Sequence, residues 1–130
     1  MSRKKVLVYC QYLLGIGHVK RCALIVQAML AEEFEVHVAL GGAPVEHISF
    51  ATAQLHYLTP VRAADQNFSA LVHIDGREFS LQDKNARCAE LIALADSVSP
   101  EALIVETYPF GRRAMRFELM PLLQWAEKQN

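Results

Sequence analysis

The chain has 130 residues, of which 52% are hydrophobic and 21% are charged, and its formal net charge is −1. This length suits one compact domain with one sizeable core, and the composition excludes global disorder. Because the net charge is close to zero, no nucleic-acid partner is expected, and any basic site must be local.

Cysteine usage and hydropathy indicate a cytoplasmic protein. The three cysteines show no CxxC spacing, which favours buried reduced thiols over a zinc site or a disulfide framework. The start, Met1–Lys5 followed by Val6–Cys10, imitates a signal peptide, but Gln11 and the glycine turn after it interrupt the apolar run. The longest apolar stretches are far shorter than the ~20 residues that a membrane span needs. We therefore expect a soluble protein with no metal site.

The first half of the chain alternates between strand and helix patterns. Val6–Gln11 is a continuous apolar run, typical of a strand covered on both sheet faces. Apolar residues recur at helical spacing over Val19–Glu32, and Glu35–Leu40 and Gln54–Leu58 are two further short strands. A short helix is expected over about Pro44–Phe50, because proline suits the first helical position. This order predicts βαβ units and a parallel sheet.

The second half begins with a polar segment, Val61–Ala70, that is expected to be a loop. Asp75-Gly76 within Leu71–Phe79 favours a small hairpin with a type I′ turn. Ser80 and Asp83 resemble a capping box, with Asp in place of the usual Glu, at the start of a helix.

That helix is expected to continue to Val98 and to end at Ser99-Pro100. Ala102–Glu106 is the next buried strand, and an interior proline should divide the last helical segment into one helix to about Met120 and another from Pro121. The elements together predict an α/β fold: a three-layer, Rossmann-like parallel sheet with helices on both faces, in a single domain over residues 1–130.

Three segments follow predicted strands and should meet at one edge of the sheet, where ligands bind in open parallel sheets. They are Gly15–Arg21, Gly41–Pro44 and Glu106–Arg113. Candidate residues for binding a substrate phosphate are the glycines and cations of these segments: Gly15, Gly17, Lys20, Arg21, Gly42, Arg112 and Arg113. Two alternatives remain open: Lys20 and Arg21 as solvated surface charges, and the two arginines paired with Glu106 and Glu118 in a structural network.

His18 follows the glycine turn at a helix start, where the helix dipole favours a neutral imidazole able to act as a base. Its alternative role is a hydrogen bond to a neighbouring loop. Glu106, at a strand end, could act as a base, orient a ligand hydroxyl or neutralise the arginines that follow it. The remaining histidines have no metal-ligand spacing and are interpreted as structural or surface residues: His37, His47, His56 and His73.

Two common nucleotide-binding motifs do not fit. Classical dinucleotide binding needs a further glycine where this chain has Lys20, and an acidic residue at the end of the second strand, where it has Leu40-Gly41-Gly42. A Walker A loop is excluded because no Gly-Lys-Ser/Thr is present.

The run Leu13-Leu14-Gly15-Ile16-Gly17-His18, together with Pro109-Phe110-Gly111-Arg112-Arg113 and Phe117–Leu123, resembles the amino-terminal domain of GT-B glycosyltransferases. The resemblance is to glycosyltransferase family 28, in a "predicted glycosyltransferase" branch, and covers nearly all of this chain but well under half of the family's usual length. It implies that His18 acts as base or contacts the acceptor, and that Gly15 and Gly17 line the acceptor or diphosphate side. For Glu106, Arg112 and Arg113 it implies only motif membership.

The resemblance implies transfer of a hexose or N-acetylhexosamine from a nucleotide-sugar, such as a UDP-sugar, to a hydroxyl acceptor, with no other cofactor. In such enzymes the donor binds mainly to a carboxy-terminal domain, so the chain is expected to be an incomplete acceptor-side domain, inactive alone. The alternatives are a non-catalytic binding subunit that pairs with a separate donor-domain protein or with itself, and part of a sugar-nucleotide epimerase. Peripheral membrane contact and self-association are further expectations, the latter because a truncated sheet exposes an apolar edge.

Overall fold

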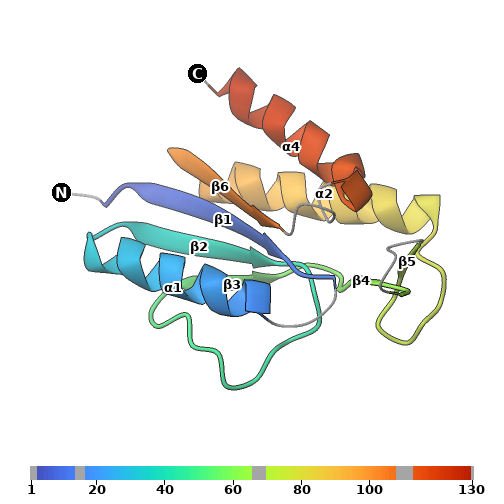
Figure 1. Cartoon of the computed structure of the whole chain (residues 1–130). Coiled ribbons are helices and arrows are strands. Elements are labelled where there is room, and N and C mark those ends of the chain that lie inside the picture. Colours follow the sequence, from blue (N-terminus) through green and yellow to red (C-terminus); the bar gives the residue numbers. More distant parts are fainter. Residues whose placement is uncertain (1–2, 14–16, 66–69, 108–112, 130) are drawn as a thin grey trace.

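The computed structural model describes residues 3–13, 17–65, 70–107 and 113–129, and Figure 1 shows their arrangement. In chain order the elements are β1 (Lys5–Gln11), α1 (Gly17–Ala31), β2 (Glu35–Leu40), β3 (Gln54–Tyr57), β4 (Arg62–Ala63), β5 (Leu71–Val72), α2 (Leu81–Val98), β6 (Ala102–Thr107) and α4 (Arg116–Lys128).

Four strands form a parallel sheet in the order β3-β2-β1-β6. Helix α1 covers one face, and α2 and α4 cover the other (Figure 1). This arrangement confirms the α/β class and the parallel sheet with helices on both faces, and it is compatible with a Rossmann-like fold.

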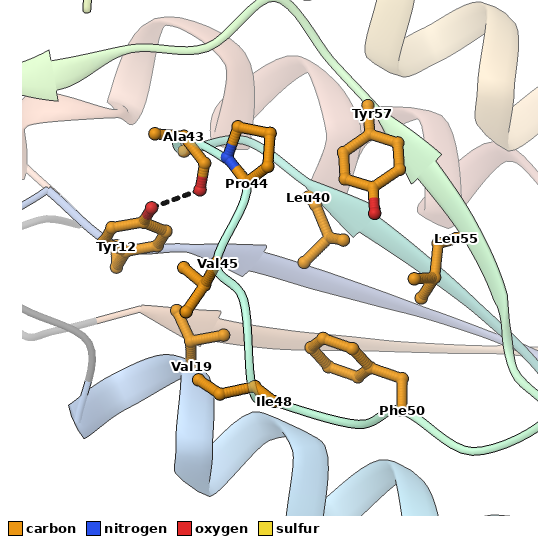
Figure 2. Close-up of a pocket in the computed structure, with 11 residues that line it drawn as sticks. Tyr12, Val19, Leu40, Ala43, Pro44, Val45, Ile48, Phe50, Leu55 and Tyr57 are labelled. Carbon is orange, nitrogen blue, oxygen red and sulfur yellow. Dashed lines mark hydrogen bonds between the residues drawn. The ribbon is translucent and has the colours of Figure 1, made fainter.

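The segment between β2 and β3 does not form the short helix expected over Pro44–Phe50. His47 has a φ of 68° and Ala51 a φ of 53°, and these left-handed conformations are incompatible with a continuing right-handed helix. Instead the segment runs across the α1 side of the sheet and turns Val45, Ile48 and Phe50 toward the core there (Figure 2). Burial of these apolar side chains overrides the helix-starting preference of Pro44.

The segment expected to be a loop over Val61–Ala70 contains β4, which pairs antiparallel with β5. The hairpin expected over Leu71–Phe79 is present, with a bridge between Val72 and Glu78. Its turn is not type I′, because that type needs positive φ at both central residues and here only Gly76, at 93°, has one. The N–H of Gly76 donates to the carbonyl of His73, as in a turn followed by a glycine bulge.

Helix α2 begins and ends as the sequence predicts. The Ser80 hydroxyl accepts a hydrogen bond from the N–H of Asp83, and the Asp83 carboxylate accepts one from the N–H of Ser80, which completes the capping box. At the other end Ser99 has a left-handed conformation and donates its N–H to the carbonyl of Ala95.

The division of the last helix at Pro121 is wrong, because α4 continues through this residue. A proline there lacks the N–H that would bond to the carbonyl of Phe117, and this lowers the stability of the helix without ending it. Packing holds the helix together, since Leu119 and Leu122 are buried on either side of the proline.

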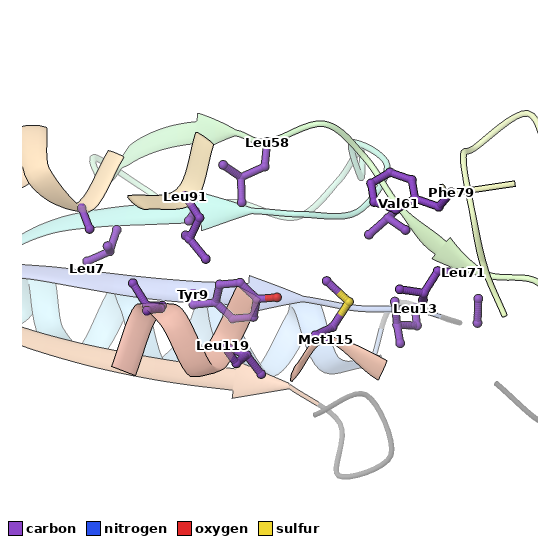
Figure 3. Packing of buried hydrophobic residues seen from close by; sticks show 14 residues of the cluster. Leu7, Tyr9, Leu13, Leu58, Val61, Leu71, Phe79, Leu91, Met115 and Leu119 are labelled. Carbon is purple, nitrogen blue, oxygen red and sulfur yellow. The ribbon is translucent and has the colours of Figure 1, made fainter. Parts of the chain in front are cut away.

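Residues of β1 alternate between two buried clusters. Val6, Val8 and Cys10 face α1, whereas Leu7 and Tyr9 face α2 and α4. The second cluster is shown in Figure 3 and also takes in Leu13, Leu58, Val61, Leu91, Met115 and Leu119. Both faces of the central strand are therefore fully covered.

Candidate functional site

The strand order identifies one position at the carboxyl edge of the sheet, between β1 and β6, where a ligand is expected to bind. After β1 the chain crosses to α1 on one face, whereas after β6 it crosses to α4 on the opposite face (Figure 1). Two neighbouring parallel strands whose connections leave in opposite directions define a topological switch point, the usual ligand position in open α/β sheets. The sequence-predicted segments after β1 and β6 flank this point.

On the α1 side, Gly17 and His18 are the first two residues of α1, and Lys20 and Arg21 follow in its first turns. The Lys20 and Arg21 side chains are exposed, and the first turn contains no acidic residue, so the positive end of the helix dipole is not neutralised from within the helix. A Cβ on Gly17 would meet nothing within 4 Å among the described atoms. Gly15 and the His18 side chain lie outside what the structure describes.

Glu106 is half-buried near the end of β6, next to Cys10 of β1. Because Ile104 packs with the cluster on the α1 side, strand alternation places Glu106 on that face too. Its negative charge contributes to the raised pKa of the Cys10 thiol, whose largest causes are a hydrogen bond to Cys22 and burial. Glu106 and the start of α1 therefore lie on the same side of the sheet edge.

Arg113 lies on the other side. It is exposed and, with Arg116, lines a groove of about 480 Å³ whose other walls are Val105, Leu119, Met120 and Leu123. The basic residues of the two helix starts thus flank opposite faces of one edge rather than gathering in one cluster. Arg112 is outside the described residues.

Close packing accounts for the two glycines of the segment after β2, Gly41 and Gly42. A Cβ at Gly41 would lie 1.9 Å from Gln11 Oε1 and 2.1 Å from Arg87 Nη2, and one at Gly42 would lie 2.4 Å from the Tyr12 ring. The Tyr12 hydroxyl also donates to the carbonyl of Ala43 (Figure 2). The adjoining pocket holds about 40 Å³, room for water, whereas ligand pockets hold roughly 300–1,000 Å³. In this conformation Gly42 serves packing, and its part in phosphate binding stays a prediction.

A buried polar cluster that the sequence pattern did not predict lies beneath this edge. Arg87 of α2 and Glu118 of α4 are fully buried and form an ion pair, with 3.2 Å between Arg87 Nη2 and Glu118 Oε2. The Tyr9 hydroxyl donates to the same carboxylate oxygen at 2.6 Å, and Arg87 Nη2 donates to Gln11 Oε1. We call these four residues the Arg87–Glu118 network.

Arg87 also connects the network to the ends of two strands. Its Nη1 donates to the carbonyl of Thr59 at 2.9 Å and to that of Gly41 at 3.3 Å. The network is not fully satisfied, because Arg87 Nε and Glu118 Oε1 are buried without a hydrogen-bond partner among the described residues. Burial raises the pKa of Glu118 against the opposing effect of Arg87, and burial together with Glu118 raises that of Tyr9.

The network bears on one open alternative, in which Arg112 and Arg113 pair with Glu106 and Glu118. Among the described residues, Glu118 pairs with Arg87. The sequence does contain a signal for the burial of Arg87, which stands four residues before Leu91 and eight before Ala95 on the buried stripe of α2.

The four histidines without metal-ligand spacing contact neighbouring side chains or lie at the surface. His73 contacts Asp83 at 3.0 Å and packs on Phe79, and His47 is exposed. His37 and His56 stack, with 3.0 Å between Nδ1 and Nε2. The cysteines are free thiols, and no cluster of three or more metal-ligating side chains occurs in the described part of the chain.

Comparison of the chain with protein-family models, curated proteins and solved structures found no match. No helix among the described residues combines the length and the apolar character needed to cross a membrane.

Proposed function

We propose that the chain is the acceptor-side part of a glycosyltransferase. Its carboxyl edge between β1 and β6 binds the acceptor and contacts the diphosphate of the nucleotide-sugar. The observation that carries this proposal is the switch point between β1 and β6, because the motif segments of the family 28 resemblance flank it. A second support is the start of α1, where two exposed cations accompany an unneutralised helix end.

In the proposed reaction His18 removes the proton of an acceptor hydroxyl, and Glu106 assists from the same side of the sheet edge. The acceptor oxygen forms a bond to the anomeric carbon of the sugar while the bond to the nucleoside diphosphate breaks. Gly15, Gly17, Lys20, Arg21, Arg112 and Arg113 offset the negative charge of the diphosphate. The donor is held mainly by a further domain.

An amide NMR titration tests the binding step without requiring turnover. The ligands are pyrophosphate, then UDP, then UDP-sugars. Binding at the switch point should shift the amide signals of Gly17–Arg21 and Glu106. Signals at these residues that stay unchanged up to millimolar ligand would contradict the proposal.

A pair of variants separates a site from general charge attraction. Lys20→Gln with Arg21→Gln should weaken pyrophosphate binding by about thirtyfold, because each of the two cations contributes on the order of 1 kcal/mol to a charge-assisted contact. Arg3→Gln with Lys4→Gln removes the same charge at the opposite end of β1 and should leave binding unchanged. Equal losses in both variants would show nonspecific attraction instead of a site.

A further inference from the structure

Strand β6 has an open edge. It pairs with β1 on one side, and no strand among the described residues pairs with its other side (Figure 1). Residues Val6–Gln11 of β1 are all buried, whereas Ala102 is exposed and Leu103–Glu106 are only half-buried. Unpaired backbone groups on an apolar strand are a template for pairing with another strand.

Helix α4 leaves two open grooves beside this strand. The groove that contains Arg113 and Arg116 lies at the carboxyl end of β6. A second groove, of about 430 Å³, lies at the amino end and is lined by Pro100, Glu101, Ala102, Leu103, Trp125, Ala126 and Gln129. In the first groove, Met120 and Leu123 of α4 are 41% and 45% exposed. The β6 edge is therefore apolar along its length, basic at one end and acidic at the other.

We propose that a second copy of this chain pairs with the β6 edge, antiparallel and about a two-fold axis, so that the two sheets become one. A two-fold axis perpendicular to the sheet reverses the strand direction and keeps corresponding faces on the same side. It therefore brings the acidic end of one copy to the basic end of the other. The proposal does not depend on the proposed function.

The alternation of side chains selects the register. Directly opposed residues of an antiparallel pair lie on the same face, and Glu101, Leu103 and Val105 share the α4 face. An axis at Leu103 places Leu103 opposite its copy and Glu101 opposite Val105. Glu101 then reaches the groove with Arg113 and Arg116, twice per dimer. The charges of this edge complement the same edge of a second copy.

Glu106, the other carboxylate of β6, does not oppose this arrangement. It lies on the α1 face, opposite Pro100 in this register, away from Glu101. Unlike-charge contacts across such an interface set the register and favour the correct partner.

Charge exchange tests the proposal with exposed residues that leave the core intact. Sedimentation equilibrium of the full chain should show a concentration-dependent dimer. Glu101→Arg alone and Arg116→Glu alone should each weaken the dimer by about tenfold, because each change places like charges together at two symmetric contacts. The double variant, with both changes, should restore the wild-type affinity. Circular dichroism of each variant should show unchanged folding.

A cysteine placed on the axis gives an independent measurement. In a Cys88→Ser background, Leu103→Cys should form a disulfide-linked dimer on mild oxidation, because the position meets its own copy. The matched control is Leu55→Cys on β3, the other edge of the sheet, which should not cross-link at the same rate. A monomer at about 1 mM, where even weak specific complexes are populated, would overturn the proposal. So would a dimer that neither charge variant weakens.

Discussion

The two faces of the sheet are buried by different chemistry. On the α1 face, Val6, Val8 and Cys10 of β1 pack in one cluster with residues of α1. The α1 residues are Val19, Cys22 and Val26. On the opposite face the same strand contributes Tyr9 and Gln11 beside Leu7, and they meet a buried arginine and a buried glutamate. The α1 face is held mainly by apolar burial, with the Cys10–Cys22 hydrogen bond within it, whereas the opposite face also contains a buried ion pair and its hydrogen bonds.

The difference follows from how the helices reach the sheet. Helix α1 follows β1 directly in the chain, so its position is limited by a short connection. Helices α2 and α4 arrive from far along the sequence, and Glu118 is 109 residues from Tyr9. Apolar packing tolerates small shifts, whereas hydrogen bonds with fixed geometry do not. We infer that the Arg87–Glu118 network determines how α2, α4 and the ends of β2 and β3 are placed relative to β1.

The largest effect is expected from breaking this network at one end. Glu118→Leu leaves the Arg87 guanidinium buried and always charged without its carboxylate, which should lower the free energy of unfolding by about 3–5 kcal/mol. Urea unfolding followed by circular dichroism measures the loss. Adding Arg87→Met to Glu118→Leu should recover part of it, because the unpaired buried charge is then absent.

Glu127→Leu is the matched control for this prediction, because it makes the same change at an exposed position of the same helix. It should alter the free energy of unfolding by less than about 0.5 kcal/mol. Arg87→Met alone completes the set of variants. If the loss in the double variant equals the sum of the losses in Arg87→Met and Glu118→Leu, the two residues are not coupled and the inference about the network is wrong.

A somewhat smaller effect is expected where the network meets the end of β2. Gly41→Ala places a methyl group against Gln11 and Arg87, and it should cost about 1–3 kcal/mol through forced displacement of buried side chains. Gly17→Ala is the comparison at the start of α1, where the added methyl meets nothing within 4 Å. It should leave stability unchanged or raise it by up to about 1 kcal/mol. Equal destabilisation by both substitutions would argue against a tight fit at Gly41.

Pro121→Ala, on the face that contains the network, is expected to stabilise the protein. It restores the N–H that can bond to the carbonyl of Phe117 and removes the clash of the proline ring, and should raise the free energy of unfolding by about 1–2 kcal/mol. Thermal unfolding measures the change. A lower melting temperature would mean that α4 is bent at Pro121 to fit α2, and that straightening it disturbs the network.

The sequence predicted the strands of the main sheet and the two longer helices. Each of these elements shows its buried face in the spacing of the apolar residues within its own segment. It failed where a distant contact overrides a local preference. Pro44 starts no helix, since Val45, Ile48 and Phe50 are drawn to the α1 side, and Pro121 ends none, since Leu119 and Leu122 pack on either side.

The candidate site shows the same limit. Parallel strands predict that the segments after β1, β2 and β6 share one edge, but not which face each side chain takes. The face of each side chain depends on which side of the sheet the following helix covers. Helices α1 and α4 cover opposite faces, and this separates Arg113 from Lys20 and Arg21. Arg87 and Glu118 were missed as a pair because a charged residue on a buried stripe reveals its partner only when the helices are packed.

The smallest effect concerns the histidine pair of β2 and β3. The Glu35 carboxylate lies 2.7 Å from His37 Nε2 and can only accept, so this nitrogen carries the proton and His37 Nδ1 accepts from His56 Nε2–H. Burial, with a contribution from His37, lowers the pKa of His56. The folded protein therefore binds fewer protons than the unfolded chain, and the free energy of unfolding should fall as the pH drops through about 6.5, the ordinary value for histidine.

His56→Gln keeps an N–H that can donate to His37 but does not titrate, so its stability should fall less steeply between about pH 7 and pH 5. The raised pKa of Glu118 acts in the opposite sense, because the folded protein keeps this proton to a higher pH than the unfolded chain does. This contribution is common to both proteins and cancels in the difference between their urea unfolding curves. His47→Gln, at an exposed histidine, should keep the wild-type slope. Identical slopes for wild type and His56→Gln would mean that the pair does not couple protonation to folding.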